Sequence, residues 1–479
     1  MDGAAFVVAG ENPEQALRQL PHASLWLKLH RSAGRPARPP VLTARLPNAA
    51  HTLAAVAFAR AGRGGFERLE LAGRLMREVV RPGVARLACE VSGFDARETA
   101  GWQDALASAA LAASAAMPDR KSIAKPATGV RSVTMHGAGG VDFARNLAES
   151  AGNHLARWLA TLPPNELDCL SYREALRHLA EREGWAFRFY DERALGRLGA
   201  GAFLAVARAN AHRGAGIVRL RYVPAGRRAA VRVSLVGKGI CFDTGGINLK
   251  SHKSMYPMHG DMQGSAVAVG TLLALARGRV PLAIDCWLAL TENEIGPRAY
   301  RPQEVVRATN GTTIQVVHSD AEGRMVLADT LAIASREKPR LVLDFATLTG
   351  ACVNALTERY SGAFTNRPAF HARLQEVGRE CGERVWCFPM DEDFDTDLES
   401  PIADLMQCTL DSKGDHILAA RFLGRFVDAD TPWVHLDLAS SERKGGLGHV
   451  PTDFTGFGVR YAARLLSDPQ FLAGLAQPA

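Results

Sequence analysis

Apolar positions in the larger, C-terminal part of the chain fall into short runs that alternate with helical patterns. Residues 143–167 carry apolar side chains at helical spacing and end near a Pro-Pro pair, which interrupts a helix. Further on, four runs rich in apolar and β-branched residues have the length of buried strands. They cover residues 229–237, 280–290, 339–348 and 432–440. Helical segments between such strands predict a helix-flanked, mixed and largely parallel sheet.

The first part of the chain has shorter elements. Residues 24–30 and 85–94 have strand-like patterns and residues 102–116 a helical one, which predicts a small α/β domain. Residues 117–129, with two prolines and four charges, are predicted to lead out of it. The chain of 479 residues is about three typical domain lengths, so at least two substantial cores are expected. We predict two domains, residues 1–135 and 136–479.

Composition is that of a globular protein, with 47% hydrophobic and 7% aromatic residues. No run reaches the roughly 18 consecutive apolar residues that a membrane helix needs. The N-terminus begins with an acidic residue and lacks the basic region of a signal peptide, so we expect a cytoplasmic protein without membrane partners. The eight cysteines form no C-x-x-C pair, which argues against a zinc ribbon and a disulfide framework.

Positive charge is concentrated near the N-terminus. Residues 1–130 carry 17 basic and 11 acidic side chains, which accounts for 6 of the net charge of +7. Such a surplus could favour nucleic acid as a partner, but no aromatic-plus-basic motif accompanies it. A solvated, arginine-rich surface is therefore the preferred interpretation, and nucleic-acid binding stays open for this part alone.

Charged side chains follow the predicted strands, where ligand sites of parallel sheets lie. Lys238, Asp243 and Lys250 come after the first long strand, among Gly237, Gly239, Gly245 and Gly246. These glycines indicate close backbone approach or positive φ. The segment does not match the G-x-x-x-x-G-K-[ST] phosphate loop or G-x-G-x-x-G.

Two further acidic positions precede helical patterns. Asp261 stands before one, and Asp320, Glu322 and Arg324 occupy alternate positions just before another. An extended entry would point the two acids the same way, with Arg324 starting the helix. The alternative is structural, because Ser319 and Glu322 fit a helix-capping box.

Four carboxylates near one lysine suit a hard or borderline divalent ion such as Mn²⁺, Mg²⁺ or Zn²⁺. Two ions are more plausible than one, since bridging carboxylates can hold a pair and a single ion would be overcharged. A mononuclear zinc peptidase is unsupported because the chain has no H-E-x-x-H.

The sequence resembles the leucyl aminopeptidase (cytosol aminopeptidase) family of dinuclear metallopeptidases. The family pattern N-T-D-A-E-G-R appears as H-S-D-A-E-G-R at residues 318–324, and V-G-K-G-x-x-F-D-[ST]-G-G appears intact at residues 236–246. The resemblance extends from about residue 145 to the C-terminus. It implies an N-terminal macro-like α/β domain, a C-terminal metallopeptidase domain, peptide substrates and a homohexamer.

The resemblance also implies roles for the charged residues. One ion would be held by Lys238, as a neutral amine, with Asp243, Asp261 and Glu322. The second would be held by Asp243, Glu322 and Asp320. Two divalent ions, Mn²⁺ or Zn²⁺ and possibly Mg²⁺, would support hydrolysis of the first peptide bond next to a free α-amine.

The remaining implied roles concern the reacting carbonyl and the first side chain of the substrate. Lys250 would stabilise the oxyanion with a backbone amide near Leu348, and Arg324 would hold a bicarbonate ion as general base. Met258, Thr347 and Phe454 would line a pocket suited to Leu or Met, although a plain core role is the alternative for each.

Two departures from the family pattern stand near these residues. His318 replaces the usual Asn, and Asp415-His416 replaces a small glycine-rich turn. A structural role for His318 is preferred over a catalytic one. Both departures leave the substrate preference and the metal open.

Other functions are compatible with parts of this pattern. The same two ions could hydrolyse a phosphoester. Alternatively, the protein could be a nucleic-acid binder with a secondary metal site, whose affinity would fall steeply with salt.

Overall fold

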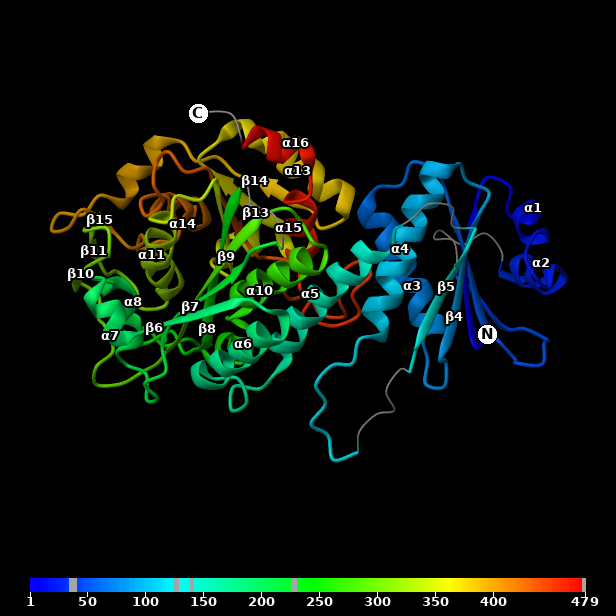
Figure 1. The fold of residues 1–479 in the computed structure, drawn as a ribbon, viewed down its shortest axis with the longest axis horizontal. Helices are drawn as coiled ribbons and strands as arrows, with labels where there is room; N and C mark the ends of the chain where they lie inside the picture. The colour runs from blue at the N-terminus through cyan, green and yellow to red at the C-terminus, as the bar shows by residue number, and fades with distance from the viewer. Residues whose placement is uncertain (34–40, 124–128, 138–141, 225–230, 476–479) are drawn as a thin grey trace. The chain divides into compact units, whose positions relative to one another are not determined.

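A computed structural model describes residues 1–33, 41–123, 129–137, 142–224 and 231–475 (Figure 1). It divides into two compact units. The first contains Met1–Ser150, Arg379–Glu383 and Arg443–Thr455, and the second contains Ala151–Gly378, Arg384–Glu442 and Gly456–Ala479. The predicted boundary between residues 135 and 136 concerns independently folding domains and stays a proposal. The predicted exit segment and boundary region include residues 124–128 and 138–141, which lie outside the described residues.

The first unit is built on a five-stranded sheet that is parallel except at β2. The strand order is β2 (Leu42–Arg45), β3 (Leu53–Ala59), β1 (Gly3–Ala9), β4 (Arg86–Ser92) and β5 (Ser132–His136). Its helices are α1 (Pro13–Arg18), α2 (Ala23–Ala33), α3 (Gly65–Val79) and α4 (Ala96–Ser114). Alternate residues of β1 join different cores: Ala5 and Val7 pack with α3 and α4, whereas Phe6 packs with α1 and α2. The sheet is therefore covered on both faces.

One predicted strand of this unit is wrong. Residues 24–30 belong to helix α2, not to a strand. The alternation of Leu and polar residues suggested a period of two, but only Trp26 of this helix is buried, and its indole donates to Pro21 O at 3.0 Å. Packing of one aromatic anchor against the sheet outweighs the local pattern. The predicted strand 85–94 and helix 102–116 are confirmed in type by β4 and α4.

An eight-stranded mixed sheet forms the centre of the second unit. The order is β14 (Val385–Cys387), β13 (Ser361–Thr365), β16 (Trp433–Asp437), β12 (Leu341–Ala346), β8 (Arg232–Asp243), β9 (Ala283–Asn293), β7 (Gly216–Tyr222) and β6 (Ala186–Asp191). The four central strands, β16 to β9, are parallel to one another. All four strands predicted for this region are present, except that residues 229–230 lie outside the described residues.

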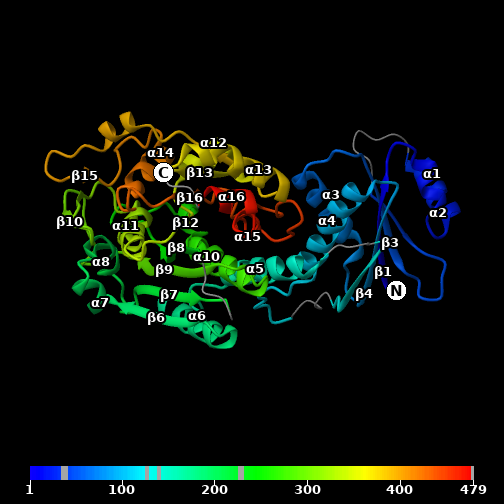
Figure 2. The same cartoon turned by 45° about the horizontal axis from the view of Figure 1, so that its top comes forward.

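Helices and short elements surround this sheet (Figures 1 and 2). The helices are α5 (Ala144–Thr161), α6 (Cys169–Glu183), α7 (Glu192–Arg197), α8 (Gly201–Ala207), α9 (His252–Met255), α10 (Gln263–Arg277), α11 (Glu322–Ser335), α12 (Gly350–Leu356), α13 (His371–Cys381), α14 (Asp415–Gly424), α15 (Val459–Leu465) and α16 (Pro469–Gly474). Short 3-10 turns are η1 (Met258–Gly260), η2 (Thr357–Arg359), η3 (Pro368–Phe370) and η4 (Glu392–Leu398). A small separate sheet contains β10 (Val305–Arg307), β11 (Thr313–Gln315) and β15 (Leu405–Met406). Helix α5 confirms the amphipathic helix predicted before the Pro-Pro pair.

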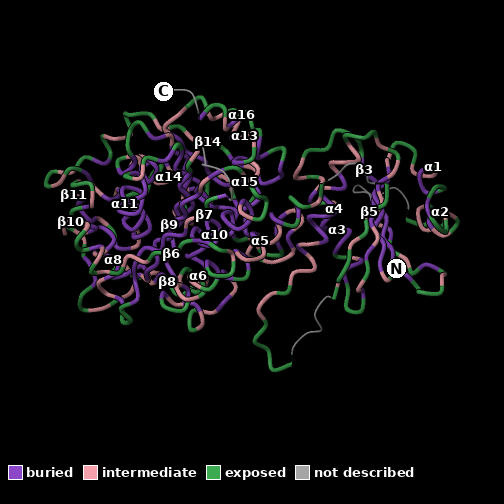
Figure 3. Tube along the Cα trace, viewed as in Figure 1, coloured by how far each residue is buried: buried purple, intermediate pink, exposed green. Residues whose placement is uncertain are grey.

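Helices α10 and α11 pack against opposite faces of strand β8. Val236 belongs to the hydrophobic core with α11, whereas a Cβ at the next residue, Gly237, would lie 2.5 Å from the Cα of Ser265 in α10. Successive side chains of a strand point to opposite faces, so one helix covers each face. Figure 3 shows the resulting burial of the central strands, and β8 and β9 are buried over most of their length. This accounts for their nearly continuous apolar sequences.

Among the described helices, none offers a stretch long and apolar enough to cross a membrane. All eight cysteines lie in the described part of the chain and are free thiols. The prediction that they form no disulfide framework is therefore confirmed.

Candidate metal centre

A group of charged side chains lies at the carboxyl ends of the central parallel strands. Asp243 is the last residue of β8 and Asn293 the last residue of β9. Thr347 follows β12 directly, and Asp437 ends β16. These four strand-end positions meet at one edge of the sheet, where ligands of such folds bind.

Lys238 lies deep in this group and is 3% exposed. Its ammonium is 2.9 Å from Asp261 Oδ1 and 3.0 Å from Glu322 Oε1, and it donates to Thr347 O at 2.9 Å. A Cβ on Gly323 would come within 2.7 Å of the lysine side chain. Glycine at this position of the E-G-R segment thus lets the first turn of α11 lie directly against Lys238.

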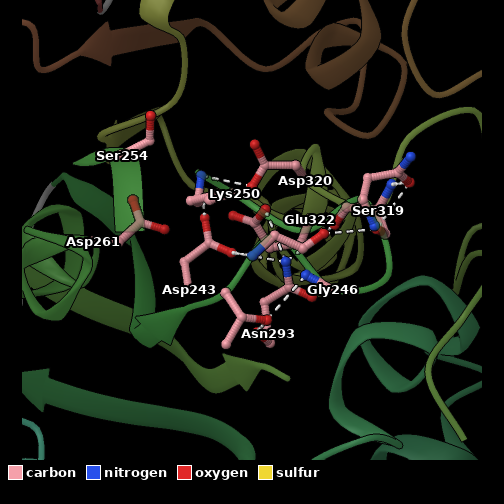
Figure 4. A network of polar contacts seen from close by, with 12 residues as sticks. Asp243, Gly246, Lys250, Ser254, Asp261, Asn293, Ser319, Asp320 and Glu322 are labelled. Atoms are coloured by element: carbon pink, nitrogen blue, oxygen red, sulfur yellow. Dashed lines mark hydrogen bonds and ion pairs between the residues drawn. The ribbon is translucent and has the colours of Figure 1, made fainter. Parts of the chain in front are cut away.

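The Gly245-Gly246 turn brings Lys250 back to the same group. Both glycines have positive φ, +86° and +65°, a conformation that other residues rarely adopt. Lys250 Nζ is 2.9 Å from Asp243 Oδ2 and 2.6 Å from Asp320 Oδ1. Figure 4 shows its ammonium between these two carboxylates. The prediction that the glycines serve positive φ or close approach is confirmed.

The segment before α11 differs from both local predictions. Asp320 lies in a turn, not in an extended entry, and Glu322 is already the first residue of the helix. Ser319 does not cap the helix: its hydroxyl donates to Gly245 O at 2.6 Å and accepts from the Asn248 amide at 2.8 Å. The hydroxyl therefore joins two loops at the site, and the capping-box alternative is wrong.

The donor set fits divalent cations. Asp243, Asp320 and Glu322 each offer an oxygen, and these three atoms lie within 4.8 Å of one another. Asp261 is 6% exposed, and its Oδ2 has no hydrogen-bond partner among the described residues. A buried carboxylate oxygen without a partner is costly, so this atom can accept a cation. Four oxygen-donating carboxylates at one place suit Mn²⁺, Mg²⁺ or Zn²⁺.

Burial and neighbouring charges shift the pKa values of these acids. Burial, followed by the charges of Glu322 and Asp261, raises the pKa of Asp243 well above its usual range. Burial also raises the pKa of Asp261, to about 6, although Lys238 opposes the shift. Burial acts in the same direction on Glu322, but Lys238 and Lys250 outweigh it and lower its pKa. More negative charge is gathered here than the two lysines neutralise, which favours added cations.

Both lysines are held as cations by these acids. Burial opposes the charge of Lys238, but Asp261, Glu322 and Asp243 overcome it and raise its pKa. The same holds for Lys250, whose pKa rises because Asp243 and other acids outweigh burial. A neutral Lys238, as the resemblance implies, would need the charge of bound ions to reverse this shift.

Asn293 is a central residue that the sequence analysis missed. Its amide nitrogen donates to Asp243 Oδ1 at 2.8 Å, to Ser319 O at 3.0 Å and to Glu322 Oε2 at 3.3 Å. Tyr300 also donates to Ser319 O, at 2.7 Å. Asn293 follows the predicted strand 280–290 closely, and this position was the available signal. The sequence analysis considered only charged residues at such positions.

Arg324 lies beside the carboxylates in a separate ion pair. It is 2% exposed, and its Nη2 donates to both oxygens of Asp415, each at 2.8 Å. Its Nη1 donates to Gln407 O at 3.2 Å. Gln407 was also missed by the sequence analysis, although its side chain accepts from the amides of Val317 and His318 and donates to Ala321 O. Asp415, which belongs to the second of the two departures, is thus the partner of Arg324.

Of the predicted pocket residues, Thr347 and Met258 lie next to Asp261. Thr347 donates to Asp261 Oδ1 at 2.8 Å, and Met258 begins the 3-10 turn before Asp261. The Leu348 amide donates to Asp437 Oδ1 at 3.1 Å, another acid that the sequence did not indicate. Phe454 belongs to the first unit. The substrate-binding roles of these residues stay predictions.

His318 is exposed, and its Nδ1 accepts from the Asp320 amide at 3.2 Å. This contact involves the backbone of the loop that carries the acids. The preferred structural role of His318 stays a prediction that this geometry supports.

Known proteins resemble the chain in sequence. A sequence profile described as "Cytosol aminopeptidase family, catalytic domain" matches residues 154–463. The probable cytosol aminopeptidase of Rhodopseudomonas palustris (strain BisA53) is 40% identical over 318 residues, 66% of this chain and 63% of the relative. That of Corynebacterium diphtheriae (strain ATCC 700971 / NCTC 13129 / Biotype gravis) is 38% identical over 324 residues, 67% and 64% of the two chains. The chain therefore spans slightly less than two thirds of the length of these curated relatives.

Solved structures resemble it over nearly its whole length. The bottromycin maturation enzyme BotP in complex with Mn matches with a TM-score of 0.84 at 31% identity, covering 97% of this chain and 98% of BotP. The cytosol aminopeptidase from Coxiella burnetii matches with a TM-score of 0.81 at 24% identity, covering 97% and 96%. The second likeness concerns the fold alone, and it confirms the predicted α/β class with two domains.

The matched span contains every member of the carboxylate group and both lysines, and it covers well over half of the sequence. The chain belongs to the cytosol aminopeptidase family.

Proposed function

We propose that the protein is a metal-dependent aminopeptidase, which hydrolyses the N-terminal peptide bond of peptides. The observation that carries the proposal is the group of four carboxylates and two lysines at the carboxyl edge of the sheet. Membership in the cytosol aminopeptidase family supports the same activity.

Two divalent ions would be held by this group. The proposed ligands of one ion are Lys238, Asp243, Asp261 and Glu322, and those of the other are Asp243, Asp320 and Glu322. When bound, such ions polarise a carbonyl, activate water at neutral pH and bind a free α-amine. Manganese is the first candidate because BotP was solved with Mn, and Zn²⁺ and Mg²⁺ are the alternatives.

Lys250 is proposed to stabilise the negative charge that develops on the carbonyl oxygen. Its raised pKa keeps the ammonium charged at neutral pH, and its side chain is 14% exposed, so it can reach a ligand at the mouth of the site. A preorganised cation at this position acts most strongly where charge develops during the reaction. The Leu348 amide is a second proposed donor, which would have to share or exchange its present partner Asp437.

The proposed substrates are peptides that begin with Leu or Met. Met258 and Thr347, which both belong to the second unit, are the proposed lining of the pocket for that side chain. We also propose that the protein works in the cytoplasm, in line with the names of its relatives. The homohexamer is proposed from the family resemblance alone. A bicarbonate ion at Arg324 stays a prediction. In the structure, Asp415 accepts the hydrogen bonds of this guanidinium.

The first experiment compares leucine p-nitroanilide with its N-acetylated form. Metal-stripped protein receives Mn²⁺, Zn²⁺ or Mg²⁺, and cleavage of the free-amine compound alone is expected. p-Nitrophenyl phosphate in the same assay tests the phosphoester alternative. No cleavage of the anilide by folded protein with any of the ions would overturn the proposal.

A matched pair of lysine variants tests the role of Lys250. Lys250→Ala is expected to lower kcat by about 100- to 1,000-fold, the usual cost of losing one oxyanion donor. Lys253→Ala is the control, because Lys253 is exposed on the adjacent helix α9. Equal activity of the two variants would remove Lys250 from the mechanism.

A further inference from the structure

Arg324 and Asp415 form an ion pair in which a buried arginine binds a carboxylate as an anion site would. Arg324 is almost fully buried, and one of its nitrogens donates to both carboxylate oxygens at 2.8 Å. Its Nε is also buried and has no hydrogen-bond partner in the part of the chain that the structure describes. Asp415 is the first residue of α14 and follows Gly414, whose φ is +61°. The turn before α14 therefore aims a carboxylate at this guanidinium.

The pair is connected to the loop that carries the proposed metal ligands. Arg324 stands two residues after Glu322 in the first turn of α11. Burial opposes the charge of Arg324, but Asp415, and to a smaller extent Glu322, raise its pKa. Gln407 accepts from Arg324 through its backbone and binds Ala321 O through its side chain at 2.9 Å. One polar network thus includes Arg324, its carboxylate partner and the backbone next to the carboxylate group.

The Asp415 side chain remains partly exposed. Its exposed fraction is 19%, whereas that of the Arg324 side chain is 3%. The neighbouring His416 adds no competing positive charge, because burial lowers its pKa. Its ring packs edge-on against Phe388, with ring centroids 4.4 Å apart. Arg324 is therefore the cation that holds Asp415.

A dissolved anion would have to displace this tethered carboxylate from Arg324. A group attached to the chain competes at a high effective concentration, so a weakly bound ion from solution is at a disadvantage. Hydrogen bonds between charged groups, such as those from Arg324 to Asp415, are also roughly twice as strong as those between neutral groups.

We infer that Asp415 occupies the anion site of Arg324 within the chain itself, and that it supplies the proton-accepting carboxylate of the proposed hydrolysis in place of a dissolved bicarbonate ion. In this step water gives a proton to the Asp415 carboxylate while its oxygen forms a bond to the substrate carbonyl carbon. When the C–N bond breaks, the Asp415 carboxyl returns the proton to the leaving amine. The catalytic part of this inference rests on the proposed aminopeptidase function, whereas the occupancy of the anion site does not.

The test uses the full-length protein and four variants. Asp415→Ala removes the carboxylate, Asp415→Asn keeps its shape without the charge, and Arg324→Ala removes the site. Asp411→Ala is the matched control, since Asp411 is an exposed acid of the same loop that pairs with Lys413. The melting temperature of each metal-free protein is measured in carbon dioxide-free buffer, with sodium bicarbonate or with sodium chloride of equal ionic strength.

Occupancy of the site is read from these melting curves. The parent protein and Asp411→Ala are expected to show no bicarbonate-specific shift. Asp415→Ala is expected to gain a saturable rise in melting temperature, which Arg324→Ala lacks. A bicarbonate-specific rise in the parent equal to that of Asp415→Ala would overturn the inference, as would the absence of any rise in both.

The catalytic role is read from activity on leucine p-nitroanilide with the activating ion present. The parent is expected to be fully active without bicarbonate, and Asp415→Ala is expected to lose about 100-fold or more, the lower range for a general base. Bicarbonate or formate should raise the activity of Asp415→Ala by at least about tenfold, because either anion can occupy the vacated site. If Asp415→Ala does not fold, Asp415→Asn tests the same loss, and full activity of either variant in bicarbonate-free buffer refutes the catalytic role.

The two readouts separate this inference from the proposed function. If the parent cleaves no peptide substrate, the proposed function fails, but the melting curves still decide whether Asp415 fills the anion site. If the parent is active and depends on bicarbonate, the proposed function holds and the inference fails.

Discussion

Replacing Asn293 by alanine tests whether the amide that joins the carboxylates also prepares them for ions. Asn293 is 1% exposed, and its one nitrogen contacts two carboxylates and a carbonyl at 2.8 to 3.3 Å. Hydrogen bonds to charged groups each contribute about 1.5–3 kcal/mol. The contact with Glu322, at 3.3 Å, is the longest of the three. The contact with Asp243 is therefore expected to account for most of the free energy lost on substitution.

The expected result is a weaker affinity for the activating ion. Loss of a group that orients metal ligands typically weakens metal binding by about 10- to 100-fold. This corresponds to about 1.4–2.8 kcal/mol, which agrees with the loss of one charged hydrogen bond. A change of this size in the dissociation constant of the ion can be measured while the fold stays unaltered.

Isothermal titration of Mn²⁺ into metal-stripped protein measures this affinity directly. Asn310→Ala is the control, since Asn310 is exposed and its side chain donates to Arg425 O, away from the carboxylates. Circular dichroism at the same temperature verifies that both variants are folded. Parental affinity in a folded Asn293→Ala protein would refute the idea that this amide sets the geometry of the acids.

Three further predictions concern stability. Asp285→Asn is expected to cost about 3–5 kcal/mol of unfolding free energy at neutral pH, because it breaks a buried ion pair. Burial opposes the charge of Asp285, but its two arginine partners lower its pKa overall. The parent should therefore lose its higher unfolding free energy relative to the variant as the pH falls through that lowered pKa, which denaturation at a series of pH values measures. Gly264→Ala should cost about 1–3 kcal/mol in chemical denaturation, since the added Cβ would lie 2.3 Å from Phe345 O, whereas Gly350→Ala meets no atom within 4 Å and should not show that loss. Chelation of bound ions should lower stability by about 2.7 kcal/mol relative to protein at a free-ion concentration of about 100 times the dissociation constant, and an unchanged melting temperature would contradict ion binding to the folded state.

The sequence predicted the central sheet well because burial on both faces leaves a clear signal. Strands β8 and β9 are buried over most of their length, and their apolar runs are correspondingly continuous. The helix α2 was missed because only Trp26 of its eleven residues is buried, so no continuous apolar stripe marks its helical period. Local pattern predicts an element well only where packing repeats with that pattern.

The charged members of the site were also predictable, but their partners were not. Asp243 and Lys250 stand in one short glycine-rich segment, so their proximity is partly a local property. Arg324 and Asp415, in contrast, are 91 residues apart in the chain, and their ion pair depends on how α14 packs near α11. Asn293 likewise reaches Asp243 across 50 residues. Such pairs follow from the order of the strands and the packing of the helices, which the sequence did not specify.

The two lysines also explain how four neighbouring carboxylates can be kept in a folded protein. Lys238 joins Asp261 to Glu322, and Lys250 joins Asp243 to Asp320, so each ammonium offsets the repulsion between two acids. If the proposed ligand set holds ions, they would take over this role, and Lys238 would have to release a proton to act as a neutral ligand. Lys250 would keep its charge and could then face the substrate. The same two side chains that hold the acids together without ions would therefore serve as a ligand and as an oxyanion donor once the ions bind.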